Sequence, residues 1–258
     1  MSGGTDMKFV KMEGLGNDFV VLEGPRQVTA AEVEAWCNRR WGIGADGVLV
    51  VTPLGDDRIR MEYWNADGSP AEMCGNGLRC VARLAHDRGW VEGDVFKVAT
   101  AVGDREARIG REVTVQVGTP EGAATVIEVA GHAARPISIG NPHAVVFVDD
   151  PAKTPVGKLG ARLGTDPAFP AGANIEFATV RSSDFIDLRV WERGVGETLA
   201  CGTGAAAAVA VAHRLGKVGA TATVRLPGGE LQVTLDEQGA WLTGPANYVF
   251  EGEWHDPS

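Results

Sequence analysis

The sequence predicts an α/β fold made of two related halves, each with mostly short strands and a helix that begins at a cysteine. The main observation is internal repetition, because aligning Cys74 with Cys201 also matches, without a gap, two glycines, an alanine, a histidine and the glycine that ends each helix. A second observation is that β-like segments alternate around turn residues on both sides of each helix. The length of 258 residues allows two domains of ordinary size.

The first half begins with a predicted loose extension at residues 1–6. A helix is expected at 29–41, with Thr29 as its N-cap and Gly42 as its stop, and a second helix at 74–88 that ends at Gly89. Strands are expected at 8–12, 19–22, 47–52, 58–64, 96–101, 106–109 and 113–117.

The second half follows the same style, with a helix at 201–215 that ends at Gly216. Trp64 and Trp191 each precede their cysteine by ten positions, and we interpret both as core anchors. Strands are expected at 125–129, 144–148, 175–180, 187–191, 223–226, 231–235 and 240–243.

Composition narrows the class of protein. The net charge is −10 and no cluster of Lys and Arg occurs, which argues against a nucleic-acid partner. The N-terminus lacks the apolar core of a signal peptide, and the longest run of small apolar residues, 205–212, is too short to cross a membrane. We therefore expect a cytoplasmic protein without a membrane partner, whose four cysteines are thiols.

The passages around Cys74 and Cys201 allow several interpretations. Structural zinc requires closely paired ligands, and Cys74 and Cys80 are separated by five residues, so no metal is expected. The stretch at 202–207 fits the start of a dinucleotide loop, but it follows a loop and lacks the acidic residue about 20 positions later. For either passage alone, a buried helix start with an inert cysteine is favoured.

The occurrence of a cysteine at the start of both helices points to chemistry. Helix N-termini carry free N–H groups and partial positive charge, which lower the pKa of a cysteine and bind a carboxylate. Two thiols acting on opposite faces of a carbon, one as thiolate and one as thiol, could remove a proton and return it to the other face. This predicts cofactor-independent racemisation or epimerisation. Cys37 and Cys80 lack this setting and are interpreted as packing residues.

At this point the sequence resembles the diaminopimelate epimerase family, nearly end to end. The resemblance is carried by G-L-G-N-D-F at 14–19, G-I-G-A-D-G at 42–47, N-A-D-G-S-P-A-E-M-C-G-N-G-L-R-C at 65–80, G-N-P-H at 140–143, A-N-I-E-F at 173–177 and W-E-R-G-V-G-E-T-L-A-C-G-T-G at 191–204. The family implies an isomerase that converts LL-2,6-diaminopimelate to the meso isomer in lysine and peptidoglycan-precursor biosynthesis. It also implies no cofactor and a homodimer.

The resemblance further implies two pseudo-symmetric domains, each a curved, mostly antiparallel sheet or barrel around a central helix, with the active site in the cleft between them. We expect residues 1–118 with 245–258 to form the half that carries Cys74, and residues 119–244 to form the half that carries Cys201.

The family also implies a set of site residues. Cys201 would accept the proton and Cys74 would donate it in the direction from the LL to the meso isomer, with His143 and Glu192 tuning the thiols. His143 is as readily explained as a histidine held in a turn. The alternative for Glu192 is a solvated loop charge, but its place beside Arg193, directly after a predicted strand, favours the site. The substrate would be bound by Asn17, Asn65, Gly75, Asn76, Asn141, Asn174, Glu192, Arg193, Gly202 and Thr203.

Other functions stay open. A racemase or epimerase of another amino acid, such as proline or hydroxyproline, would share the two thiols, and an amino-acid binding protein could use them as a redox switch. A phenazine-biosynthesis-like member of the fold would lack one or both cysteines, and both are present. Gly47 departs from the glutamine found in some family members, so no side chain can approach the substrate from this position.

Overall fold

The computed structural model describes residues 6–122 and 125–255, and the predicted extension lies outside the described residues except for Asp6. The chain forms two compact units, unit 1 with residues 1–114 and 245–258, and unit 2 with residues 115–244. Strand β8 (Val113–Gly118) contains this boundary and pairs with β17 of unit 2. The sequence-based boundary after residue 118 falls at the end of the same strand.

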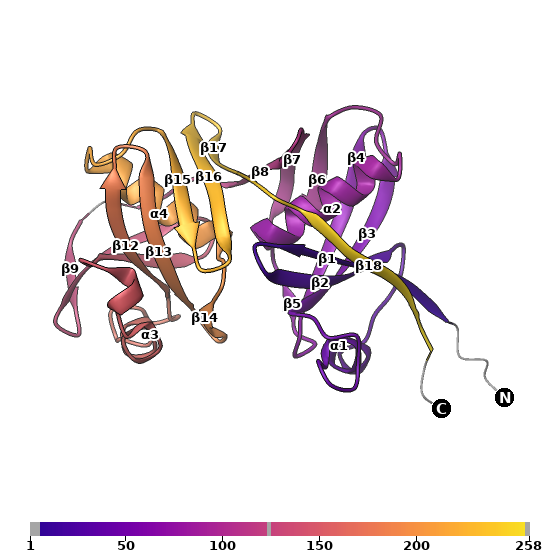
Figure 1. Ribbon diagram of the computed structural model, residues 1–258, viewed down its shortest axis with the longest axis horizontal. Helices are drawn as coiled ribbons and strands as arrows, with labels where there is room; N and C mark the ends of the chain where they lie inside the picture. Colours follow the sequence, from indigo (N-terminus) through magenta and orange to yellow (C-terminus); the bar gives the residue numbers. More distant parts are fainter. Residues whose placement is uncertain (1–5, 123–124, 256–258) are drawn as a thin grey trace. The chain divides into compact units, whose positions relative to one another are not determined.

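Unit 1 is a mixed sheet in the order β18-β1-β2-β3-β4-β6-β7, with parallel pairing of β2 with β3 and of β4 with β6. The yellow strand β18 runs beside the indigo strand β1, although the two lie at opposite ends of the sequence (Figure 1). The strands are β1 (Met7–Gly14), β2 (Asn17–Glu23), β3 (Gly47–Gly55), β4 (Arg58–Asn65), β5 (Pro70–Ala71), β6 (Val95–Thr100), β7 (Gly103–Ile109) and β18 (Asn247–Trp254).

Unit 2 repeats this plan, with parallel pairing of β11 with β12 and of β13 with β15. Its helices are α3 (Val156–Gly164) and α4 (Gly202–Arg214), with a short 3₁₀ turn, η1 (Pro151–Lys153), before α3. The strands are β9 (Ile127–Val129), β10 (His132–Ser138), β11 (Pro142–Phe147), β12 (Asn174–Ser182), β13 (Phe185–Glu192), β14 (Gly196–Thr198), β15 (Thr221–Leu226), β16 (Gly229–Asp236) and β17 (Gly239–Gly244).

The element order confirms the repeat. From β1 to β8, the chain forms two strands, helix α1 (Ala30–Cys37), three strands, helix α2 (Gly75–Asp87) and three strands, and β10 to β17 follow the same order around α3 and α4. In unit 1, α2 contacts β1 near one side of the sheet and β7 at the other, so the strands curve around it (Figure 1). The predicted α/β class and the central helix of each half are therefore confirmed.

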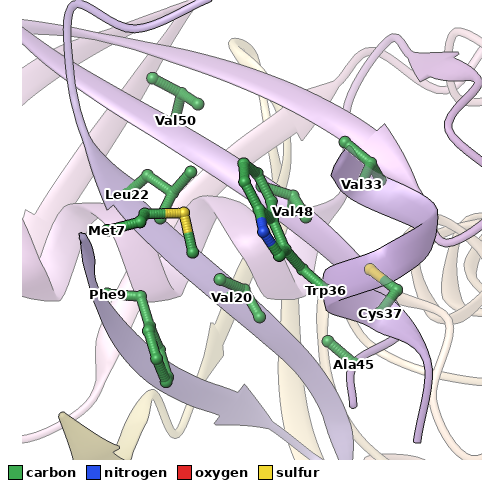
Figure 2. Packing of buried hydrophobic residues seen from close by; sticks show 10 residues of the cluster. All are labelled: Met7, Phe9, Val20, Leu22, Val33, Trp36, Cys37, Ala45, Val48 and Val50. Carbon is green, nitrogen blue, oxygen red and sulfur yellow. The ribbon is translucent and has the colours of Figure 1, made fainter. Parts of the chain in front are cut away.

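Strands β2 and β3 of unit 1 are buried on both faces. Val20, Leu22, Val48 and Val50 face α1, where they pack around Trp36 (Figure 2). The alternating residues Phe19 and Leu49 lie on the other face, beside Gly77 of α2. Strands covered on both faces have near-continuous apolar sequences, which is why β2 and β3 lack a polar alternation.

The predicted core tryptophans are confirmed in both units. Trp64 packs against the α1 cluster, and Trp191 packs against the corresponding cluster under α3. A Cβ on Gly160 of α3 would lie 2.3 Å from Trp191 Cβ, so only a glycine lets α3 approach this strand.

Helix α1 is shorter than predicted. Thr29 is its N-cap and forms a capping box with Glu32, as the sequence indicates. The helix ends at Cys37 and not at Trp41, because Asn38 adopts an extended conformation and its side-chain oxygen accepts from the N–H groups of Arg40 and Trp41.

The two cysteine-led helices end as the sequence predicts. Cys74 and Cys201 are the N-caps of α2 and α4, both with extended backbone, and each helix has 13 residues. After each helix, Gly89 and Gly216 adopt left-handed conformations with φ of 67° and 66°. The elements that the sequence did not predict are α3, β10 and β18, together with the short η1, β5 and β14.

Candidate active site

In unit 1, the predicted polar residues gather at one edge of the sheet. Phe19 on β2 pairs with Gly47 on β3, and Gly47 pairs with Asn65 at the end of β4. Asn17, which begins β2, therefore lies at the same edge as Gly47 and Asn65. The N-cap Cys74 also lies there, because its thiol donates a hydrogen bond to Asn17 Oδ1 over 3.4 Å.

Asn17 links two of the predicted site residues. Its Oδ1 accepts from Cys74 Sγ and also from Asn76 Nδ2, at 3.3 Å. Asn76 is buried in the first turn of α2 and Cys74 is half-buried. Asn65 lies at the edge of this group, where its amide donates to Ser69 Oγ at 3.0 Å.

A charged network that the sequence reasoning missed holds Asn17 in place. Asp46 Oδ2 accepts from Asn17 Nδ2 at 2.9 Å, and Asp46 Oδ1 accepts from Arg39 at 2.6 Å. Arg39 also binds both oxygens of Asp18, which forms an ion pair with the buried Lys11. Burial raises the pKa of Asp18, but the hydrogen bonds from Arg39 and Lys11 outweigh it and lower that pKa to about 2.

Gly47 has no room for a side chain. A Cβ there would lie 2.5 Å from the Trp64 carbonyl oxygen and 2.6 Å from Tyr63 Cε2. The aromatic ring of Tyr63 therefore occupies the space beside this position.

In unit 2, the corresponding edge of the sheet carries the other predicted residues. His143 on β11 pairs with Asn174 on β12, and the next residue, Ile175, pairs with Trp191, which precedes Glu192. Asn174 thus stands where unit 1 has Gly47, and Glu192 stands where unit 1 has Asn65. The repeat therefore places a carboxylate in one half at the position of an amide in the other.

Cys201 is buried at the start of α4. Its sulfur accepts from the Gly204 N–H at 3.4 Å and lies 3.6 Å from Thr203 Oγ1. Burial raises its pKa well above the ordinary value, and the carboxylates of Glu192 and Glu176 add to this, while the contacts with Thr203 and Gly204 lower it. The expectation of a lowered pKa is therefore wrong for Cys201 in the structure, because loss of hydration outweighs the contacts with Thr203 and Gly204.

His143 is wholly buried and connects two other polar residues. Its Nε2 lies 2.9 Å from Asn141 Oδ1, and its Nδ1 lies 2.7 Å from Glu176 Oε1. Glu176 was not among the predicted site residues, although it belongs to the A-N-I-E-F stretch. Burial raises the pKa of Glu176, and the nearby His143 lowers it less.

Glu192 and Arg193 lie where β13 ends. The Thr198 hydroxyl donates to Glu192 Oε1, and the Arg193 backbone N–H donates to Asn174 Oδ1 at 2.8 Å. The Arg193 guanidinium donates to the Ala171 carbonyl oxygen at 2.6 Å. The Arg193 side chain is exposed, so it can exchange this carbonyl for an anionic ligand.

The helix N-termini supply the remaining predicted contacts. Gly75 and Asn76 begin α2, and Gly202 and Thr203 begin α4. The N–H groups of a first helical turn have no acceptor within the helix and favour a bound anion. Each unit therefore combines a cysteine sulfur with N–H donors suited to a carboxylate.

A pocket of ≈ 620 Å³ lies within unit 2 and reaches two predicted residues, Asn141 and His143. Its other walls are largely apolar and include Ile127, Pro136, Ile137, Pro142 and Phe169. The polar side chains of Glu121, Thr125 and Ser138 also line this pocket.

The other two cysteines are packing residues, as predicted. Cys37 lies in the α1 cluster and Cys80 is buried in α2. Burial raises their pKa values, to about 11 for Cys37 and to about 12 for Cys80. Within residues 6–122 and 125–255, no group of three or more His, Cys, Asp and Glu side chains could hold a metal ion. None of the helices in that part of the chain is long and apolar enough to span a membrane.

Solved structures share this fold. A phenazine biosynthesis protein of the PhzF family from Bacillus anthracis matches with a TM-score of 0.76 and 17% identity, covering 97% of this chain and 99% of that one. A hydroxyproline epimerase from Agrobacterium vitis matches with a TM-score of 0.70 and 17% identity, covering 96% of this chain and 92% of that one. At such identities the likeness shows the fold alone.

Sequence relatives are closer. A diaminopimelate epimerase from Moorella thermoacetica is 39% identical, covering 96% of this chain and 99% of its own length, and one from Desulforapulum autotrophicum is 38% identical, covering 96% and 98%. The family described as Diaminopimelate epimerase matches residues 9–124 and 136–249. The fold and these relatives define the chain as an isomerase of the epimerase class. It belongs to the diaminopimelate epimerase family.

Proposed function

We propose that the chain interconverts LL- and meso-2,6-diaminopimelate, with Cys74 and Cys201 as its two acid–base groups. The observation that carries this proposal is the equivalent placement of the two cysteines, each the N-cap of the helix at the centre of one repeated unit. The activity belongs to lysine and peptidoglycan-precursor biosynthesis, and no cofactor takes part.

The two cysteine sulfurs account for both proton transfers of the reaction. In the direction from LL to meso, the Cys201 thiolate removes the α-proton, and the electron pair of the C–H bond passes into the adjacent carboxylate. The Cys74 thiol then donates its proton to the opposite face of the carbon, which leaves Cys74 as thiolate and Cys201 as thiol. The reverse reaction, or proton exchange with water, restores the starting state.

The protein must stabilise the charge that develops on the substrate carboxylate. The N–H groups of Gly75 with Asn76, and of Gly202 with Thr203, are suited to this because they carry the partial positive charge of two helix N-termini. Because burial raises the pKa of Cys201, its thiolate also needs a nearby cation. The α-ammonium group of the substrate supplies one.

The distal end of the substrate requires a separate set of contacts. A molecule with two carboxylates and two ammonium groups needs donors and acceptors together, and holding the distal end fixes which stereocentre reacts. Arg193 is suited to a carboxylate, and Glu192 is suited to an ammonium group. The amides that complete the proposed binding set are Asn17, Asn65, Asn141 and Asn174.

The test is turnover in deuterated water. We expect wild type to epimerise LL-diaminopimelate with deuterium incorporation at one α-carbon, and Cys74→Ser and Cys201→Ser to lose epimerisation. Cys37→Ala is the matched control, since this cysteine lies in the α1 cluster. If both serine variants kept wild-type epimerisation and exchange, the two-thiol proposal would be wrong. L-Proline and trans-4-hydroxy-L-proline, assayed in parallel, test the alternative substrates.

We also propose that the protein is a cytoplasmic homodimer. Support comes from strand β18, on which Tyr248, Val249 and Phe250 are exposed apolar side chains. Sedimentation of wild type and Phe250→Asp tests this, and a wild-type monomer at micromolar concentration would contradict it.

A further inference from the structure

Glu176 is a buried carboxyl group that the two-thiol reaction does not use. It lies on β12 between Ile175 and Phe177, which pack into the core under α3. Because side chains alternate along a strand, Glu176 points to the opposite face, toward α4. Its side chain is wholly buried, and within the described residues its Oε2 has no hydrogen-bond partner.

The hydrogen bonds of His143 determine how many protons the imidazole of His143 and the carboxyl group of Glu176 hold together. An amide oxygen can only accept, so the contact from His143 Nε2 to Asn141 Oδ1 requires a proton on Nε2. The contact from Nδ1 to Glu176 Oε1 then needs one further proton, carried either by the carboxyl group or by the imidazole. In both cases the pair of His143 and Glu176 has no net charge.

This pair lies beside the Cys201 sulfur. A Cβ on Gly204 would be 2.9 Å from Glu176 Oε1 and 3.3 Å from Cys201 Sγ, so the carboxyl group and the sulfur border the same bare glycine. The titratable groups that face Glu176 are His143 on β11, Glu192 at the end of β13 and Cys201 at the start of α4. A negative charge on Glu176 would act directly against a thiolate on Cys201.

We infer that Glu176 is a positioning residue that shares one proton with His143, so that an uncharged pair borders Cys201 and the imidazole is held toward Asn141. The shared proton does not depend on the proposed function, but the expected effect on turnover rests on it. Glu176 acts through the position of His143 and Asn141 and through the charge near Cys201. Burial raises the pKa of Glu176, and this also favours a proton on the carboxyl group.

Two substitutions distinguish a role of Glu176 in sharing a proton from a role in packing alone. Glu176→Gln keeps the shape and offers an N–H to His143 Nδ1, which imitates the protonated carboxyl group. We expect it to keep turnover within about threefold of wild type and to leave the pH profile of kcat/KM in place. Glu176→Ala removes the partner of His143, and we expect kcat to fall by about 10- to 100-fold. Glu230→Gln, on the exposed side of β16, is the matched control.

The pH profile of Glu176→Gln shows whether the pair of His143 and Glu176 is charged. If the pair carried a negative charge, Glu176→Gln would remove it and move the limb of the pH profile that reports Cys201 to lower pH, by about one unit or more. Such a shift would overturn the inference, and so would a Glu176→Ala variant with wild-type kcat and an unchanged profile. Thermal unfolding of each variant shows whether a loss of activity is only a loss of folding.

A measurement without substrate keeps this inference distinct from the proposed function. In protein labelled with ¹⁵N at histidine, NMR reports the protonation of each imidazole nitrogen. We expect His143 to keep a proton on Nε2 between pH 6 and 9, and Glu176→Gln to give the same Nε2–H tautomer. A neutral His143 with its proton on Nδ1 would overturn the inference even if diaminopimelate is turned over. A failure of turnover with the expected tautomer would contradict only the proposed function.

Discussion

Asn17 Oδ1 lies 3.4 Å from Cys74 Sγ, in a geometry where the thiol donates and the amide oxygen accepts. The amide is oriented because its other end donates to Asp46 Oδ2 at 2.9 Å. The state of Cys74 that can make this bond is the thiol, which is also the state that a proton donor needs. Asp46 therefore supports the assigned role of Cys74 without contacting the sulfur.

Replacing Asp46 should slow catalysis more than it weakens folding. In Asp46→Ala the Asn17 amide loses one anchor and can rotate away from the sulfur. We expect kcat for LL-diaminopimelate to fall by about tenfold, which is a part of the roughly 10²- to 10⁴-fold that a positioned acid or base contributes. Steady-state kinetics measure this. Asp104→Ala, which removes a surface ion pair with Arg58, serves as control. An unchanged kcat in Asp46→Ala would show that the amide needs no anchor.

The bare glycine at the start of α4 should be intolerant of a methyl group. In Gly204→Ala the new Cβ would lie 2.9 Å from Glu176 Oε1, so the carboxyl group or the helix start must shift, and we expect a loss of stability of about 1–3 kcal/mol together with a fall in kcat. Gly157→Ala is the matched helical glycine, since a Cβ there meets nothing within 4 Å. We expect it to be neutral or stabilising by up to about 1 kcal/mol in urea unfolding. If Gly204→Ala and Gly157→Ala changed stability and kcat equally, the predicted clash between a methyl group at position 204 and Glu176 would be wrong.

Acid should weaken unit 1 through Asp18. Because the pKa of Asp18 falls from 3.8 to about 2, its contribution to stability is complete above pH 3.8 and disappears as the pH falls toward 2. We expect the difference in unfolding free energy between wild type and Asp18→Asn to shrink by roughly 1–2 kcal/mol between pH 5 and pH 2. Asp149→Asn, at an exposed position, is the control. A difference that stays constant across this range would contradict the assignment.

Arg79 is a wholly buried arginine in α2, and its loss should destabilise unit 1. Its guanidinium donates to Asn76 Oδ1 at 2.8 Å and to the Pro245 carbonyl oxygen at 3.1 Å. Arg79→Met removes the donor from both oxygens, at about 1–3 kcal/mol for each. Urea unfolding should show this loss, while the exposed Arg60→Met should stay within about 0.5 kcal/mol of wild type. Equal stability of Arg79→Met and Arg60→Met would contradict it.

Local patterns predicted the helices that begin at the cysteines, because cap and stop residues act within a few positions of one another. Helix α3 was missed because its sequence contains three glycines, which are poor helix formers, and its stability comes from contact with Trp191. The repeat itself contained the missing signal, since α3 is the counterpart of α1.

The parts of the site that sequence reasoning missed depend on distant residues. Glu176 sits in a strand, and only the pairing of β12 with β11 places it against His143, which is 33 positions away. The raised pKa of Cys201 likewise depends first on burial and then on Glu192 from another strand, whereas the helix N-terminus is visible locally. Asp46 belongs to a quoted motif, but its bond to Asn17 spans 29 positions.

The pairing of β1 with β18 sets an order on the assembly of the chain during translation. Unit 2 is one continuous segment, so all of it is synthesised before the last strand of unit 1. The second repeat is therefore complete in sequence before the first, whose strand β1 is paired with β2 but still lacks β18 on its other side. Until residues 247–254 pair with β1, the sheet of unit 1 has an open edge that is exposed to pairing with other chains.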